Sequence, residues 1–360
     1  MTIKDNNLYF IGGVVRDEFL GTASFDVDYC YEGDAIKFAE NQNFNIIKSN
    51  CDLGTVRINY NDNEIDIAST RMERYPLPGH LPVIDKIACS LEEDLKRRDF
   101  TINALAKNTI TDEIIDYYNG VQDIADKKLR ILHEKSFIDD PSRIIRGLKF
   151  AVRFNFDLEE HTFELQNEYL NNINYDMSYH RIKKEIIETF NLNKFRAYEL
   201  FLTQNIYKLL GPNEPVFYLK KDVEELIEKY SAKYSWVIYM AGFVLDNLSL
   251  NADEKAIIDS YIRINDIKPK NSIDAYKLFV KEPLESIILY ALTVDKEVAL
   301  NYLDNLSNIK LNITGEDLIM LNIPQGKIYK DIIDYVLAYK INNPNITKDD
   351  ELDLVKKRFL

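Results

Sequence analysis

Residues 10–29 read FIGGVVRDEFLGTASFDVDY, in which a short apolar strand runs into two glycines, a predicted helix over 14–20, and then two acids that alternate with apolar residues. Glycines at a strand-to-helix turn let the backbone approach a ligand, and the helix N-terminus adds exposed N–H groups that suit a phosphate. Taken alone, such a turn is more often plain turn geometry. The acids that follow favour the phosphate site.

The two acids are Asp26 and Asp28, which lie two residues apart on a strand predicted over 25–31 and therefore share one face. Carboxylates this close repel each other and lose solvation, and Mg²⁺, which prefers oxygen ligands, readily offsets both costs. The alternative is an exposed edge strand with acids on its wet face. A third acid favours the metal site: Asp66 on a later strand could complete the cluster, although Glu64 shares its face and leaves the third ligand open.

The composition of the whole chain limits the class of protein to which it can belong. Its 360 residues are 46% hydrophobic, enough for more than one core, and its net charge of −14 argues against a protein that coats nucleic acid by electrostatics alone. Three cysteines fit no disulfide framework, so we expect a reducing cytoplasm. The sequence has no signal-peptide pattern and no apolar run near the ~18 residues of a membrane helix, so we expect no membrane partner.

The pattern of elements changes near Pro141. We predict that the last two strands before it form an antiparallel hairpin through Asn61, Asp62 and Asn63, which are turn formers. After Pro141 we expect helices and no strands. The main predicted strands are 8–12, 25–31, 55–60 and 64–69, and the main predicted helices are 141–154, 178–191, 223–230 and 331–340. The chain is therefore expected to be an α+β head followed by an all-helical part.

Several motifs, in order along the chain, resemble those of the polymerase-beta-like nucleotidyltransferases. The resemblance narrows to the bacterial and eukaryotic type (class II) of tRNA nucleotidyltransferases, the CCA-adding enzymes, and to the bacterial poly(A) polymerases that share their head. Besides the Gly-Gly turn and the acid pair, the motifs are residues 91–104 (LEEDLKRRDFTINA), 139–146 (DDPSRIIR), 178–185 (SYHRIKKE) and 314–324 (TGEDLIMLNIP). The resemblance implies a catalytic head with a mixed sheet over 1–138, a helical neck with a base-reading motif over 139–200, and a helical body and tail that bind tRNA over 201–360.

The activity implied by this resemblance is transfer of C, A or both from CTP and ATP to the 3′ end of a tRNA, with release of pyrophosphate. The added residues could be the whole CCA, only CC or only the terminal A. A poly(A) polymerase is the first alternative, although the chain lacks a long basic tail, and a catalytically silent RNA-binding relative is the second. In the two-metal scheme, Asp26 and Asp28 would hold Mg²⁺ and act in catalysis with Asp66.

Base selection is implied for an acid-Asp-x-x-Arg motif that begins at Asp139. Asp140 can accept from the exocyclic amine of cytosine or adenine, and Arg143 can donate to the ring nitrogen beside it, so guanine and uracil would leave both side chains unpaired. Arg146 and Lys149 follow on the same helical face as Arg143. The other nucleotide contacts implied by the resemblance are Gly12, Gly13, Arg16, Asp17, Arg98, Asp99 and Asn103.

The sequence departs from the family pattern at three positions. Lys149 stands where relatives have Arg, Asp139 is shorter than the usual Glu, and His180 stands where many relatives have a Glu that braces neighbouring arginines. Alternative interpretations remain for single motifs: Arg16 and Asp17 could form a surface ion pair. The other histidines, which have no nearby His or Cys in the sequence, are expected to carry no function: His80, His133 and His161.

Overall fold

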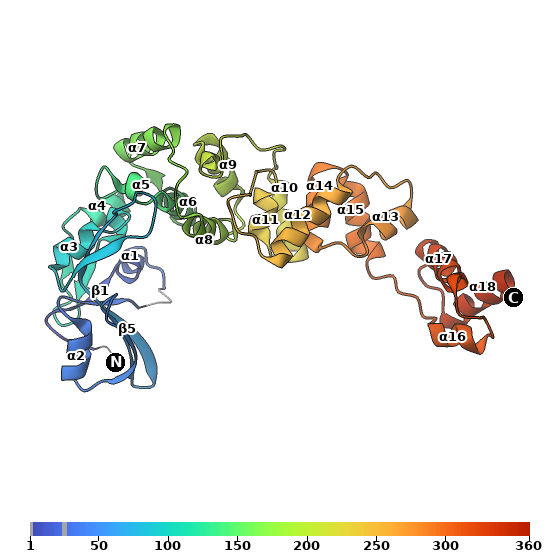
Figure 1. Cartoon of the computed structure of the whole chain (residues 1–360), viewed down its shortest axis with the longest axis horizontal. Coiled ribbons are helices and arrows are strands. Elements are labelled where there is room, and N and C mark those ends of the chain that lie inside the picture. The colour runs from blue at the N-terminus through green and yellow to red at the C-terminus, as the bar shows by residue number, and fades with distance from the viewer. Residues whose placement is uncertain (1–2, 24–26) are drawn as a thin grey trace. The chain divides into compact units, whose positions relative to one another are not determined.

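The computed structural model describes residues 3–23 and 27–360 (Figure 1). It divides into two compact units. The first comprises Met1–Glu214 with Phe243–Ser249, and the second Pro215–Gly242 with Leu250–Leu360. The predicted head and neck both fall in the first unit, and the boundaries at 138 and 200 remain predictions.

A seven-stranded mixed sheet forms the centre of the first unit, in the order β3-β4-β5-β2-β1-β8-β9. Neighbouring strands are antiparallel except β2 and β5, which are parallel. The strands are β1 (Leu8–Ile11), β2 (Tyr29–Tyr31), β3 (Asn45–Asn50), β4 (Thr55–Tyr60), β5 (Asn63–Ser69), β8 (Ala106–Asn108) and β9 (Ile114–Ile115). The α+β class and the mixed sheet are thus confirmed.

The β4–β5 hairpin is confirmed with a tighter turn than expected. Tyr60 pairs with Asn63, so only Asn61 and Asp62 form the loop. Both have positive φ angles, 51° and 61°, as a two-residue turn that matches the twist of its strands requires. Because Asn63 joins the ladder, Glu64 and Asp66 keep the alternation that places them on one face.

Alternating residues of β1 contribute to two hydrophobic clusters. Leu8 packs in the cluster that contains Phe38 of α2 (Ala35–Asn41). Tyr9 and Ile11 pack in the cluster that contains Leu95 of α3 (Leu91–Lys96). Because successive side chains of β1 point to opposite faces, both faces of the strand are buried. This packing holds the end of the strand, where Gly12 begins the turn, in a fixed direction.

Small elements connect the sheet to the helices. They are α1 (Gly13–Phe19), β6 (Arg71–Arg74), β7 (Val83–Ile87), η1 (Thr101–Asn103), α4 (Gly120–Ala125), β10 (Lys128–Leu129), α5 (Ser136–Asp139) and β11 (Asp157–Leu158). The expectation of no strand after Pro141 is wrong at β11. Its two residues pair in parallel with β10, because the chain returns beside residues 128–129 when α6 ends at Asn155 in a left-handed conformation.

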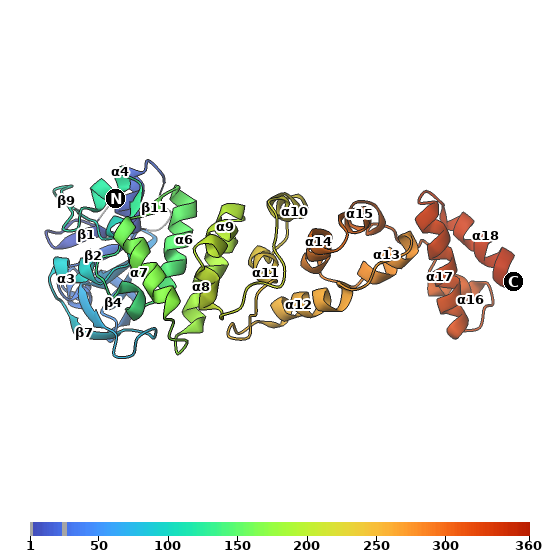
Figure 2. The same cartoon turned by 90° about the horizontal axis from the view of Figure 1, so that it is seen from above.

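The helices of the first unit then follow one another. They are α6 (Ser142–Phe154), α7 (Glu160–Asn171), α8 (Tyr179–Phe190), α9 (Phe195–Thr203) and η2 (Ile206–Leu209). Helix α6 packs against α8 and α9 (Figure 2). Phe243, which the chain returns to this unit, lies against the rings of Phe201 and Tyr207 with centroids 5.4 and 6.1 Å away.

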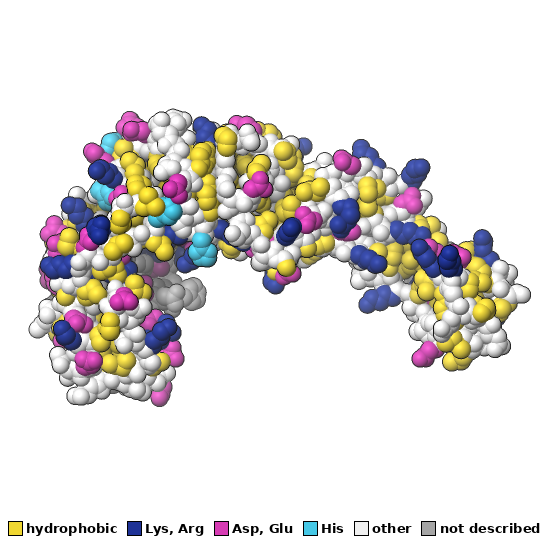
Figure 3. All heavy atoms as spheres, in the orientation of Figure 1, with side chains coloured by type: hydrophobic (Ala, Val, Ile, Leu, Met, Phe, Trp, Pro, Cys, Tyr) yellow, Lys and Arg dark blue, Asp and Glu magenta, His cyan; other side chains and the backbone are white. Residues whose placement is uncertain are grey.

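All described elements of the second unit are helices. They are α10 (Asp222–Tyr230), α11 (Ser235–Met240), α12 (Ala252–Ile264), α13 (Ser272–Phe279), α14 (Leu284–Thr293), α15 (Lys296–Asn301), η3 (Tyr302–Leu306), α16 (Gly315–Met320), α17 (Lys327–Asn342) and α18 (Lys348–Phe359). Near the C-terminus, Lys340 and Glu351 form a buried ion pair. On the face drawn in Figure 3, Lys and Arg side chains are interspersed with Asp and Glu along these helices. None of the helices in the described ranges is both long and apolar enough to cross a membrane.

Candidate active site

The turn between β1 and α1 requires glycine at position 12. Gly12 has a φ of +69°, and its N–H donates to the Leu105 carbonyl at 2.9 Å. A Cβ there would lie 2.9 Å from Nη1 of Arg98. Gly12 therefore lets Arg98, from the RRDFTINA motif, lie directly against the turn.

Arg16 lies one helical turn further on and is buried rather than exposed. Its Nε and Nη2 donate to Oδ1 of Asp17 at 2.9 and 2.7 Å, and its Nη1 donates to Oδ1 of Asn103 at 2.5 Å. The guanidinium also lies over the ring of Phe154, 4.5 Å from the centroid. Arg16 and Asp17 thus form an ion pair, but the pair is buried and orients the Arg16 side chain. It is not the surface ion pair that the sequence allowed.

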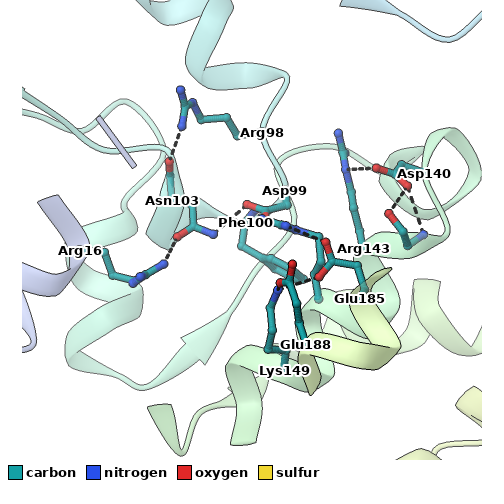
Figure 4. Close-up of polar contacts among 12 residues, drawn as sticks. Arg16, Arg98, Asp99, Phe100, Asn103, Asp140, Arg143, Lys149, Glu185 and Glu188 are labelled. Carbon is teal, nitrogen blue, oxygen red and sulfur yellow. Dashed lines mark hydrogen bonds and ion pairs between the residues drawn. The ribbon is translucent and has the colours of Figure 1, made fainter. Parts of the chain in front are cut away.

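Asp99 continues this network (Figure 4). Its Oδ1 accepts from Nδ2 of Asn103 at 2.9 Å and from the N–H of Phe100 at 2.7 Å, while its Oδ2 accepts from Nε of Arg146 at 2.8 Å. Burial alone would raise the pKa of Asp99, but the charge of Arg146 and these hydrogen bonds lower it to about 2. Asp99 is therefore ionised at neutral pH and links the Gly-Gly turn to helix α6.

The basic residues of α6 are held by carboxylates of α8. Nη1 of Arg146 donates to Oε1 of Glu185 at 3.0 Å, and Nζ of Lys149 donates to Oε2 of Glu185 at 2.7 Å and to Glu188 at 2.5 Å. His180, which replaces the usual bracing Glu, is exposed. Glu185, which lies further along α8, thus supplies a carboxylate that holds Arg146, and Lys149 contacts the same carboxylate.

Asp140 is almost fully buried just before α6. Its Oδ1 accepts from the N–H of Ser142 at 3.1 Å and from the Ser142 hydroxyl at 2.5 Å. Its Oδ2 pairs with Nη2 of Arg181 on α8. One carboxylate oxygen of Asp140 is therefore bonded to the first residue of α6, while the other is fixed by a cation.

Arg143 is also buried, and protein acceptors surround it. Nη1 donates to the Ser136 hydroxyl at 2.6 Å, and Nη2 donates to the Arg97 carbonyl at 2.9 Å. Nε lies 3.8 Å from Oδ2 of Asp140. The two residues expected to read the base are therefore neighbours, each oriented by the protein.

The expected metal ligands are only partly described. Asp26 lies outside the described residues. Asp28 directly precedes β2, where Tyr29 pairs with Ile67 in parallel, so continuation of this register sets Asp28 beside Asp66. Both oxygens of Asp66 accept from Arg57 of β4, at 2.8 Å from Nε and 2.7 Å from Nη2, and Glu64 lies 3.4 Å from Nη1 of the same side chain. These hydrogen bonds from Arg57 lower the pKa of Asp66.

Asp28 and Asp66 supply carboxylate oxygens of the kind that Mg²⁺ prefers. No group of three His, Cys, Asp or Glu side chains suited to a metal occurs among residues 3–23 and 27–360. In the described part of the site, Asp28 and Asp66 therefore lie side by side, and Asp66 is engaged by Arg57.

Three cavities meet at Asp28. One of about 520 Å³ is lined by both glycines of the turn and by most of the other nucleotide-contact candidates, namely Arg16, Arg98, Asp99, Asn103, Asp140, Arg143 and Arg146. The candidates Asp17 and Lys149 do not line it. A second, of about 490 Å³, is lined by Lys48, Arg57 and Asp66, and a third, of about 970 Å³, by Glu64 and Asp66. The first cavity also brings in residues that we did not single out from the sequence: Arg71, Glu73, Tyr75, Arg97, Arg181 and Glu185.

Among these additional residues, Arg97, Glu185 and Arg181 have a sequence signal, because each lies within a quoted motif. Arg181 lies in the motif over 178–185. Its Nη1 is buried with no hydrogen-bond partner in the described part of the chain. Arg71 and Arg97 both pair with Glu73, at 2.8 and 3.0 Å. No spacing in the sequence connects Glu73 with Arg97, which is why this contact could not be predicted.

Residues 8–130 match the family described as the poly A polymerase head domain. Over 96% of its length the chain is 30% identical to an A-adding tRNA nucleotidyltransferase of Geobacter sulfurreducens, of which it spans 44%. It is 28% identical to the A-adding tRNA nucleotidyltransferase of Halalkalibacterium halodurans, with 98% of this chain and 89% of that one covered.

A solved structure of a CCA-adding enzyme in an apo form has the same fold. The TM-score is 0.80 and the sequence identity 26%, with 97% of this chain and 91% of the other covered. The similarity therefore extends beyond the head into the helical part of the chain.

Proposed function

We propose that the chain is a tRNA nucleotidyltransferase of the bacterial and eukaryotic type (class II), which its motifs and its relatives support. It would transfer a nucleoside monophosphate from ATP, CTP or both to the 3′ hydroxyl of a tRNA and release pyrophosphate. One observation carries the proposal: an unbroken hydrogen-bonded row, Arg16–Asn103–Asp99–Arg146, borders the cavity that also contains Asp28, Asp140 and Arg143. The groups proposed to bind phosphate, to hold a metal and to read the base thus line one space large enough for a nucleotide.

The triphosphate would bind at the Gly-Gly turn. The exposed N–H groups at the start of α1 and the guanidinium of Arg98 offer donors on one side of the cavity. Arg16 is already oriented by Asp17 and Asn103, so it can contact a phosphate without losing side-chain freedom on binding.

Nucleotidyltransferases generally use divalent metal ions, and for this chain we propose Mg²⁺, held by Asp26 and Asp28. When bound, the ion would neutralise phosphate charge and promote attack by the RNA hydroxyl. Asp66 would act beside them, because it neighbours Asp28 in the sheet and its carboxylate stays ionised through its contact with Arg57.

Base selection is proposed for Asp140 and Arg143. The carboxylate of Asp140 and the Nε–H of Arg143 match the amine and the adjacent ring nitrogen that adenine and cytosine share. A base with the opposite pattern would set acceptor against acceptor and donor against donor. Asp99 would accept from a ribose hydroxyl on the same nucleotide, which favours ribonucleotides.

We further propose that the tRNA product carries at least the terminal A. The relatives from Geobacter and Halalkalibacterium, which match almost the whole of this chain, are both named A-adding enzymes. The structural neighbour is named a CCA-adding enzyme, so addition of C remains part of the test. A poly(A) polymerase is the second candidate because the matched family takes its description from that activity. Action on tRNA agrees with the reducing cytoplasm that we expect from the cysteines.

The decisive experiment uses purified protein, Mg²⁺, each labelled NTP, and tRNA transcripts that end at the discriminator base, at C, at CC and at CCA. Extension of only the CC transcript by one A would establish A addition, stepwise growth to CCA would establish the complete activity, and long A tails would establish the poly(A) polymerase. Asp28→Asn should remove incorporation, whereas Asp259→Asn, at an exposed site on α12, should not. If the wild-type protein incorporates nothing on any transcript, the proposed function is wrong, and the chain is either a silent RNA-binding relative or acts on a substrate other than tRNA.

A further inference from the structure

His133 lies in the turn before α5, next to Arg143, the arginine proposed to read the base. Its Nε2 is 3.4 Å from Nη1 of Arg143, and its Nδ1 is 4.0 Å from Oδ2 of Asp139. The same turn supplies Ser136, whose hydroxyl accepts from the same Nη1 at 2.6 Å. His133 and Ser136, which lie a few residues before the base-reading motif, are thus the two described acceptors for Nη1 of Arg143.

The other end of this guanidinium is also held. Nη2 donates to the Arg97 carbonyl at 2.9 Å and lies 3.5 Å from the Tyr75 hydroxyl. Nε has Oδ2 of Asp140 at 3.8 Å, which is too long for a hydrogen bond. Because a guanidinium is planar, fixing both Nη atoms determines where the Nε–H edge points, and that edge lies beside Asp140 in the cavity.

His133 can accept from Arg143 only while Nε2 is unprotonated. Burial and the positive charges of Arg143 and Lys96 lower the pKa of His133 to about 4, so the imidazole is neutral near pH 7. The ring proton then belongs on Nδ1, on the side of Asp139. A protonated imidazole would instead place a second positive charge next to Arg143.

We propose that His133 is a positioning residue for base selection: it accepts from Nη1 of Arg143 and, with Ser136, turns the guanidinium so that its Nε–H edge and Asp140 face the nucleotide base. The inference rests on the proposed function, because it assigns how the base-reading pair is oriented. His133 does not line the cavity and acts through Arg143.

The test compares substitutions at His133 that differ in where they place an acceptor. In His133→Gln the side-chain oxygen reaches the position of Nε2, in His133→Asn it stops near Nδ1, and His133→Leu has no acceptor. His161→Leu is the matched control, because His161 is an exposed histidine of α7 that contacts Glu164. For each protein, kcat and KM are measured for all four NTPs on the transcript that the wild type extends best.

We expect the Asn and Leu variants to lose about tenfold or more in the preference for the correct base over G and U, mainly through KM of the correct NTP. The Gln variant and the His161 control should keep the wild-type preference. Unchanged preference in both the Asn and Leu variants would overturn the inference, as would an equal loss in the Gln variant. Thermal unfolding of each variant separates these results from loss of the fold, and the Asn variant serves if Leu does not fold.

Failure of the inference can be distinguished from failure of the proposed function. If the wild type incorporates no nucleotide, the proposed function is wrong and the inference falls with it. If the wild type selects its base and the variants do so equally well, only the role of His133 is wrong.

Discussion

Arg146 of helix α6 forms an ion pair with Asp99 of the RRDFTINA motif. Its Nε and Nη2 lie 2.8 and 2.7 Å from the same oxygen, Oδ2 of Asp99. The two residues are 47 positions apart in the chain. Through this contact and that of Arg146 with Glu185, the phosphate end of the site and the helices that follow the head share one ion-pair network. We therefore expect the contact to have a structural role in addition to the nucleotide-binding role proposed for both residues.

Arg146→Met should lower the free energy of unfolding by about 3 kcal/mol, because it leaves two buried carboxylates, Asp99 and Glu185, without their shared cation. Urea denaturation at pH 7 measures the change. Arg196→Met, which removes the exposed pair with Asp157, is the control and should cost less than about 1 kcal/mol. Equal costs for the two variants would contradict a structural role for the network.

Substitutions can distinguish the catalytic contributions of Asp66 and Glu64, although both side chains contact Arg57. Asp66→Asn should reduce nucleotide incorporation by about 100-fold or more, because Asp66 neighbours Asp28 in the sheet and would interact with the ion and the attacking hydroxyl. Glu64→Gln should change the rate only slightly. Single-turnover incorporation measures both rates, and the reverse order would make Glu64 the third catalytic acid.

Arg143→Lys keeps the positive charge but loses the planar fork that several acceptors hold in place. We expect the ratio of kcat/KM for the correct base over G and U to fall by about tenfold or more, while tRNA binding stays near the wild-type level. Incorporation assays with all four NTPs and a tRNA-binding titration provide the two readouts. Arg263→Lys, at an exposed site on α12, should leave both unchanged; an unaltered base preference in Arg143→Lys would place base reading elsewhere.

His133 gives stability a specific dependence on pH. Because burial, Arg143 and Lys96 lower its pKa to about 4 in the folded protein, the unfolded chain binds a proton first as the pH falls. The free energy of unfolding should therefore decrease between about pH 6.5 and pH 4 through this group. His133→Gln has no such titration, so urea denaturation at pH 7 and pH 5 should show a smaller decrease in the variant; equal decreases would contradict the prediction.

The sequence predicted those parts of the site that depend on local chain geometry. Gly12 is required by the turn itself, and Glu64 and Asp66 keep the alternation of β5. Asp140 and Arg143 are one helical turn apart, so their proximity follows from the helix. The main strands of the head and the helical part were likewise readable from periodicity, whereas the mixed sheet was implied only by the family resemblance.

Contacts between distant segments could not be read in the same way. Glu185 braces Arg146 and Lys149 because α8 packs along α6, and sequence spacing gives no measure of that packing. His133 has no metal-ligand partner in the sequence and therefore suggested no function, yet the fold places it on Arg143. The short β10–β11 pairing was missed for the same reason, since two residues carry too little periodicity to identify a strand.

The division into two units has a consequence for how this architecture can be rearranged. The chain passes from one unit to the other after Glu214, after Gly242 and after Ser249, and the returned segment brings Phe243 to Phe201 and Tyr207. A fragment that stops at Glu214 would lack this ring and leave an aromatic core incomplete. The first unit is therefore discontinuous in sequence, and exchange of the second, helical unit between relatives, in the laboratory or in evolution, would require two segments to be replaced together.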